Sequence, residues 1–110
     1  MKEIPEVANL ARYYRGVVPM AVASGGQRIF VEASLRACNL TELFDTIVTF
    51  NEVAEGKPSP ALFLEAARRL RVEPERCLVL EDSVQGLEAA SRATMQSIDV
   101  RHVRDLTDLS

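Results

Sequence analysis

Four short apolar runs alternate with segments of helical periodicity along this chain, and no other feature limits its fold as much. The runs predict strands at 17–24, 45–50, 76–81 and 95–100. Apolar residues at helical spacing predict helices at 6–16, 27–38, 60–70 and 84–94. Strands that alternate with helices of this length form right-handed βαβ units, whose parallel sheet is covered by helices on both faces. The sequence therefore predicts an α/β fold.

Single residues predict where several of these elements end and which way they face. Gly16 is expected to stop the first helix, and Ser59 and Ser83 to cap the last two, with Pro60 in a first helical turn. Thr94 falls where a left-handed residue should close the last helix, a position that suits glycine better than a β-branched residue. In the helix at 27–38, the residues expected to face the core are Ile29, Phe30, Ala33 and Ala37.

Length and composition narrow the class of protein. The chain has 110 residues, 47% of them hydrophobic, which suits one domain with a real core. A net charge of -3 gives no reason to expect nucleic acid or an anionic membrane as a partner, and no apolar run is long enough to span a membrane. Cys38 and Cys77 are expected to be buried free thiols, typical of the cytoplasm. Arg68, Arg69, Arg71 and Arg76 are expected to form a solvated helix face.

Polar residues gather where three of the predicted strands end. Ser24 ends the first strand, Lys57 lies in the loop after the second, and Glu81 with Asp82 ends the third. In parallel α/β sheets, ligands bind beyond the carboxyl ends of the strands. Two carboxylates suit Mg²⁺, and a lysine, a serine hydroxyl and the N–H groups of Gly25 and Gly26 suit a phosphate group. The edge is therefore predicted to bind an anion and a metal ion.

Each of these residues also has a plain structural interpretation. Ser24 could cap a helix, Lys57 could lie in a solvated turn, and the acidic pair could favour the positive end of the next helix. Only their common position at three strand ends favours a site. A signalling domain phosphorylated on aspartate shares the α/β plan, but no predicted strand ends in a lone aspartate near an acidic pair, so this reading is set aside.

The motifs "VASGG", "GKPSP" and "LVLEDSVQGLEAA", in this order, resemble the haloacid dehalogenase-like hydrolases, in particular the sugar-phosphate phosphatases and β-phosphoglucomutases. The resemblance runs from about Val17 to Val100. It implies that Ser24 binds the transferring phosphoryl group, that Lys57 stabilises it, and that Glu81 and Asp82 hold Mg²⁺. It also implies a Rossmann-like three-layer sandwich and a small phosphorylated metabolite as substrate.

One motif of that family has no match in this chain. The family's first strand ends in D-x-D-G-T and supplies the aspartate nucleophile, whereas the five aspartates here form no D-x-D pair. The resemblance thus implies a single partial core domain: a leading helix at 1–16, the core at 17–100 and a tail at 101–110. It looks like the C-terminal half of a family member, without the helical cap domain.

The missing strand would be the central one of the family's sheet, between the strands that end at Ser24 and at Asp82. Without it we expect those two strands to pair directly, or another chain or an exchanged arm to fill the gap, or the monomer to be marginally stable. Two functions stay open: a phosphatase core that is inactive alone because it lacks the nucleophile, and a non-catalytic binding or interaction module derived from the same fold.

Overall fold

The computed structural model describes residues 5–102 and contains every predicted helix and strand. The helices are α1 (Pro5–Tyr14), α2 (Arg28–Ala37), α3 (Ala61–Leu70) and α4 (Val84–Arg92). The strands are β1 (Ala21–Ser24), β2 (Thr46–Thr49), β3 (Leu78–Glu81) and β4 (Gln96–Asp99). The predicted α/β class is confirmed. The tail predicted at 101–110 lies outside the described residues, except for its first two. No described helix is both long and apolar enough to cross a membrane.

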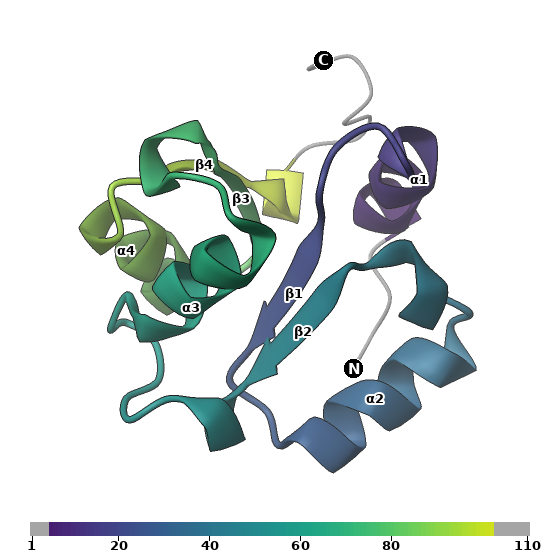
Figure 1. Ribbon diagram of the computed structural model, residues 1–110, viewed down its shortest axis with the longest axis horizontal. Coiled ribbons are helices and arrows are strands. Elements are labelled where there is room, and N and C mark those ends of the chain that lie inside the picture. The colour runs from purple at the N-terminus through teal and green to yellow at the C-terminus, as the bar shows by residue number, and fades with distance from the viewer. Residues whose placement is uncertain (1–4, 103–110) are drawn as a thin grey trace.

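The strands form two separate parallel pairs (Figure 1). β1 pairs with β2, with Ala21 opposite Thr46, and β3 pairs with β4, with Leu78 opposite Gln96. Direct pairing of β1 with β3, one of the alternatives that the sequence left open, is therefore wrong for the part of the chain that the structure describes. α3 packs on β1 and β2, and α4 packs on β3 and β4. The two pairs are joined by side-chain packing, through the cluster that contains Phe63 of α3 and Val79 of β3, and not by backbone pairing.

Helices cover both faces of the β1–β2 pair and build the core in three clusters. Met20, Val22 and Ile47 pack against buried residues of α1 and α2, such as Ala11 and Leu35. Ala21, Ala23 and Val48 point to the opposite face, toward Leu62 and Ala66 of α3. A third cluster joins α3 to α4 and β3 through Phe63, Val79 and Ala89. This is the three-layer arrangement expected of a partial Rossmann-like core.

The face that α2 turns to the core differs from the prediction. Ile29 and Phe30 are 69% and 67% exposed, and Ala33 and Ala37 are exposed as well. Val31 and Leu35 are buried instead, at 4% and 2%. Both sets recur at helical spacing, so the periodicity alone allows either face. Val31 and Leu35 belong to the same buried cluster as Leu40 and Leu43, which follow the helix, and this packing decides which face of α2 is buried.

The predicted helix ends are mostly confirmed. Gly16 has a φ of 77°, the left-handed conformation that glycine favours after a helix. The Ser83 hydroxyl accepts a hydrogen bond from the Gly86 N–H at 3.0 Å and caps α4. The predicted Ser59 cap of α3 is wrong by one residue, because Pro60 is the N-cap and α3 begins at Ala61, although the Ser59 hydroxyl accepts from the Ala61 N–H at 3.3 Å. Thr94 adopts a φ of 62°, which costs a β-branched residue about 1 kcal/mol relative to glycine.

Candidate functional site

Lys57 joins the carboxyl ends of β1 and β3. Its ammonium donates to the Ala23 carbonyl at 3.2 Å and to Oε2 of Glu81 at 2.8 Å. Only 17% of the Lys57 side chain and 9% of the Glu81 side chain are exposed. The ammonium also lies 5.0 Å from the centre of the Phe63 ring, close enough for a cation–π interaction. The structure thus brings Lys57 and Glu81 together beside the end of β1, where the sequence predicted a shared site.

Ser24 begins an open loop at this edge. Its hydroxyl accepts a hydrogen bond from the Gly26 N–H at 3.1 Å, and Gly25 and Gly26 are both exposed. Ser24 does not cap α2, because the residue at that position is Gln27 and the first helical N–H, of Arg28, donates to the side chain of Asn51 at 2.8 Å. The helix-cap interpretation of Ser24 is therefore excluded.

The carboxylate of Glu81 is buried and fully engaged. Oε1 accepts from the Asp82 N–H and from the Ser83 hydroxyl, each at 3.1 Å, while Oε2 accepts from Lys57. Burial alone would raise the pKa of Glu81, but the hydrogen bond and charge of Lys57, with the bonds from Asp82, outweigh burial and lower that pKa. Glu81 is therefore ionised at neutral pH and forms a buried ion pair with Lys57.

Gly86 leaves the space that the Glu81 carboxylate occupies. A Cβ atom placed on Gly86 would lie 2.0 Å from Cδ of Glu81, far inside van der Waals contact. Glu81 ends β3 and Gly86 lies in the first turn of α4, so the carboxylate packs against the start of that helix. This close approach explains why a glycine stands in a helix whose neighbouring residues have side chains.

A third acidic residue of this edge, beside Glu81 and Asp82, was not predicted from the sequence. Asp99 ends β4 and lies opposite Glu81 in the strand register. It accepts hydrogen bonds from Arg101 at 2.6 to 3.2 Å, and Arg101 also interacts electrostatically with Asp82. The sequence placed Asp99 inside a strand, and only the pairing of β4 with β3 brings it to the edge.

The donor set can be compared with what Mg²⁺ requires. Asp82 is exposed at the edge, whereas Glu81 already binds Lys57. Among the described residues, no group of three or more acidic, histidine or cysteine side chains is arranged to hold a metal ion. Both oxygens of Glu81 already accept hydrogen bonds, so Asp82 is the exposed carboxylate of the pair. Mg²⁺ often binds through one or two carboxylates and keeps several waters, and Asp82 fits that mode of binding.

A charged network fixes the segment between β2 and Lys57. Glu52 accepts hydrogen bonds from Arg28 of α2, from Arg69 of α3 and, at 3.0 Å, from the Thr49 hydroxyl. Both arginines also donate to the Ile47 carbonyl of β2. Arg69 therefore does not belong to the solvated face predicted for the arginines of α3, because its partners lie across the fold. The network anchors the start of the loop that carries Lys57.

Acid should destabilise this network in a defined range of pH. Burial raises the pKa of Glu52, but the hydrogen bonds from Arg28, Arg69 and Thr49 prevail and lower it from 4.5 to about 2. A carboxylate with a lowered pKa stabilises the fold above its unfolded pKa and loses that contribution as the pH falls through the folded pKa. We therefore expect Glu52 to account for a loss of about 2–3 kcal/mol between pH 4.5 and 2.

Urea unfolding at a series of pH values would measure this loss. Glu52→Gln should lower the unfolding free energy at pH 7 and flatten its decline below pH 4.5. Glu55→Gln, at an exposed position in the same loop, is the matched control and should keep the slope of the unaltered protein. Equal slopes for Glu52→Gln and the control would show that Glu52 does not carry the acid sensitivity.

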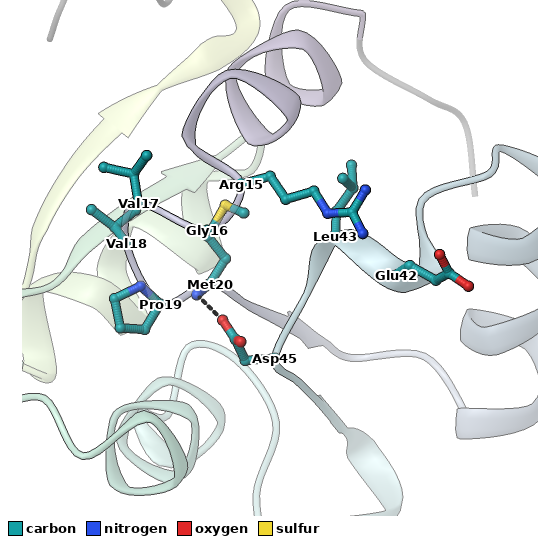
Figure 2. A pocket seen from close by; sticks show the side chains of 9 residues that line it. All are labelled: Arg15, Gly16, Val17, Val18, Pro19, Met20, Glu42, Leu43 and Asp45. Atoms are coloured by element: carbon teal, nitrogen blue, oxygen red, sulfur yellow. Dashed lines mark hydrogen bonds between the residues drawn. The ribbon is translucent and has the colours of Figure 1, made fainter.

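A pocket lies at the other end of the strands (Figure 2). It has a volume of about 420 Å³ and is lined by Arg15, Gly16, Val17, Val18, Pro19, Met20, Glu42, Leu43 and Asp45. Asp45 accepts a hydrogen bond from the Met20 N–H at 2.8 Å, directly before β1 and β2 begin. Asp45 is thus remote from Lys57 and Glu81, and the pocket is not part of the candidate site.

The fold agrees with what comparisons with known proteins show. A sequence model described as "haloacid dehalogenase-like hydrolase" matches residues 2–94. The chain therefore belongs to the haloacid dehalogenase-like hydrolases.

Its relatives include phosphatases. The chain is 37% identical over 95 residues to the fructose-1-phosphate phosphatase YqaB of Escherichia coli, covering 86% of this chain and 50% of the relative. A crystal structure of CbbY from Rhodobacter sphaeroides in complex with phosphate matches with a TM-score of 0.79 and 38% identity, over 91% of this chain and 48% of that one. A crystal structure of a hydrolase of the family from Deinococcus radiodurans, with bound phosphate and sodium, also matches with a TM-score of 0.79 and 38% identity. This match covers 86% of this chain and 42% of that one. The chain spans about half the length of these relatives.

Proposed function

We propose that this chain forms the phosphate- and metal-binding part of a Mg²⁺-dependent phosphatase that acts on a small phosphorylated metabolite, such as a sugar phosphate. The observation that carries the proposal is the position of Lys57, whose ammonium lies 3.2 Å from the end of β1 and 2.8 Å from Glu81. Relatives of the chain include a fructose-1-phosphate phosphatase and a CbbY structure with bound phosphate.

Each residue of the edge has a role in this proposal. The Ser24 hydroxyl and the N–H groups of Gly25 and Gly26 hydrogen-bond the phosphoryl oxygens. Lys57 supplies a positive charge to the same oxygens, and its bond to Glu81 fixes where that charge lies. Asp82, with Glu81 beside it, would hold Mg²⁺, which neutralises phosphoryl charge when bound.

The proposal needs a nucleophile from outside these 110 residues. Asp45 lies at the opposite end of the strands, Asp82 is assigned to the metal, and Asp99 binds Arg101. Asp105 and Asp108 lie outside the described residues. We therefore propose that an aspartate carboxylate on a separate segment or chain attacks the phosphorus and displaces the hydroxyl group of the metabolite. Water then hydrolyses the aspartyl phosphate, which releases inorganic phosphate and restores the carboxylate. The 110-residue chain alone should bind phosphate without turnover.

The state of the two cysteines bears on the cellular compartment of the chain. Cys38 and Cys77 are free, as predicted, although both are half-buried rather than buried. Burial, followed by the nearby charge of Glu75, raises the pKa of the Cys77 thiol, which keeps it protonated and unreactive at neutral pH. Free thiols suit a reducing compartment, and we propose the cytoplasm.

Two measurements on the purified chain test the proposed function. Titration of inorganic phosphate in the presence of Mg²⁺, followed by NMR, should shift the amide signals of Gly25 and Gly26. Lys57→Met should weaken that binding at least about tenfold, because a charge-assisted hydrogen bond is lost. In the second measurement, the unaltered chain should release no more phosphate from an aryl phosphate than the Asp82→Asn variant does.

The outcomes separate the competing functions. Release that Asp82→Asn abolishes would show that the chain already contains its nucleophile. If phosphate binds without release, a co-expressed segment that ends in D-x-D-G-T should restore release under the proposed function. A chain that binds phosphate but stays inactive with that segment would instead be the non-catalytic binding module.

A further inference from the structure

The loop at residues 24–26, which we call the phosphate loop, contains two consecutive glycines. Glycine loses more conformational freedom on folding than any other residue, and a Cβ atom added to Gly25 would meet no atom within 4 Å. Inside the loop the Gly26 N–H donates to the Ser24 hydroxyl at 3.1 Å, and both glycines are exposed. This local hydrogen bond alone does not fix two exposed glycines, so contacts from another part of the chain are needed to hold the loop.

The turn that follows β2, η2 (Phe50–Glu52), supplies such contacts. The Phe50 N–H donates to the Gly26 carbonyl at 3.2 Å. The side-chain oxygen Oδ1 of Asn51 accepts from the Arg28 N–H at 2.8 Å, across 23 residues of sequence. These two hydrogen bonds hold the last residue of the phosphate loop and the first residue of α2, so they fix where the loop joins the helix.

The same turn leads into the loop that carries Lys57, so it connects the two halves of the candidate site. Val53, directly after the turn, packs against the buried cluster that contains Val48 of β2. A Cβ atom on Gly56 would meet the Phe50 ring at 3.7 Å, so this ring lies beside the residue before Lys57. The turn therefore helps to set where the phosphate loop and Lys57 lie relative to one another.

The turn is itself anchored to the strands and helices below it. Thr49, the last residue of β2, is 0% exposed, and its hydroxyl donates to Glu52 at 3.0 Å. Glu52 also accepts hydrogen bonds from the guanidinium groups of Arg28 in α2 and Arg69 in α3. The turn is thus a support fixed on three elements, from which Asn51 reaches the start of α2.

Asn51 takes the part that an N-cap residue normally plays. The N-cap residue of α2 is Gln27, and its side chain makes no capping hydrogen bond. Asn51 accepts from the first helical N–H in its place, although Asn51 itself is exposed and does not belong to the core. Loss of the Asn51 side chain therefore removes a contact that holds the start of α2 and leaves the packing of the core intact.

We propose that Asn51 is a positioning residue of the phosphate site, which holds the N–H groups of Gly25 and Gly26 in the orientation that binds phosphate. It acts through the backbone of Arg28 rather than on the phosphate itself. A loop that is ordered before its ligand arrives loses less conformational entropy on binding, so it binds more tightly. The inference rests on the proposed function and deepens it, because it states what sets the phosphate affinity of that same site.

Phosphate titration of Asn51→Ala tests this proposal on the folded chain. With Mg²⁺ present, the variant should bind inorganic phosphate about fivefold more weakly than the unaltered chain, as followed by the amide signals of Gly25 and Gly26. A purely structural role would lower the unfolding free energy in urea but leave the phosphate affinity of the folded chain unchanged. Asn9→Ala is the matched control, because it makes the same change at an exposed position of α1 and should keep the affinity.

A second measurement follows the loop in the absence of phosphate. In Asn51→Ala, hydrogen exchange of the Arg28 amide should be at least about tenfold faster, and the NMR order parameters of Gly25 and Gly26 should fall. Asn51→Asp keeps a side-chain oxygen at the same place and should restore both values, since asparagine and aspartate cap helices equally well.

The outcomes separate this inference from the proposed function. Equal phosphate affinities of Asn51→Ala and the unaltered chain would overturn the inference and leave the proposed function standing. Order parameters of the phosphate loop that do not respond to Asn51→Ala would overturn it as well. If the unaltered chain itself fails to bind phosphate, the proposed function is refuted and the positioning role falls with it.

Discussion

Gly86→Ala should destabilise the protein by about 3 kcal/mol, although the same change in a helix interior ordinarily stabilises by about 0.5–1 kcal/mol. The added Cβ would lie 2.0 Å from Cδ and 2.3 Å from Oε2 of Glu81. The carboxylate would have to move, but it is held by Lys57, by the Asp82 N–H and by the Ser83 hydroxyl. Its displacement therefore breaks the buried ion pair and releases Lys57.

Helix propensity alone would make Gly86→Ala more stable, whereas the close approach of Glu81 should make it less stable, so the sign of the change in unfolding free energy decides between them. Urea unfolding of Gly86→Ala gives the free energy, and phosphate titration shows whether the binding edge survives. Gly56→Ala is the matched control, because it likewise adds one methyl group, at the residue before Lys57. That methyl group would meet only the Phe50 ring, at 3.7 Å, which is an ordinary contact. The control should cost less than about 1 kcal/mol. Equal stability of the two variants would mean that Glu81 can leave its position freely.

The strand ends were predictable from sequence, and with them the candidate site. β1 and β3 are short apolar runs that each stop at a polar residue, so Ser24 and Glu81 could be placed at strand ends. The rule that parallel strands share a carboxyl edge then predicted that they lie together. The prediction for α2 failed because Ile29 and Val31 begin two apolar stripes on one helix. Periodicity cannot choose between two such stripes, and the choice depends on tertiary packing.

The charged network could not be predicted, because its partners are distant in sequence. Glu52 binds Arg28, 24 residues before it, and Arg69, 17 residues after it. Local rules favour pairs three or four residues apart, such as Glu65 with Arg69, and these do form. The same limitation hid Asp99, whose position beside Glu81 follows from the pairing of β3 with β4. Contacts across strands and layers thus carry the part of the site that the sequence does not reveal.

Removing the charge of Lys57 should cost about 3–5 kcal/mol, because it leaves the buried carboxylate of Glu81 without its cation. Lys57→Met keeps much of the side-chain volume, so the loss reports on charge rather than on packing. Glu81→Gln should cost less, because the Lys57 ammonium still has the Ala23 carbonyl and the Phe63 ring as partners. The double variant, in which both charges are gone, should be more stable than Lys57→Met alone.

A double-mutant cycle on urea unfolding measures this coupling. We expect an interaction free energy of about 2–3 kcal/mol between Lys57 and Glu81, well above the value for an exposed pair. Arg92 and Glu88 supply the control cycle: their ion pair has a similar length, 2.7 Å against 2.8 Å, but the side chains are 54% and 48% exposed, and coupling should be below about 1 kcal/mol. Equal coupling in both cycles would mean that water reaches Lys57 and Glu81 in solution, and that the edge lacks the low-dielectric environment in which a lysine stabilises a phosphoryl group strongly.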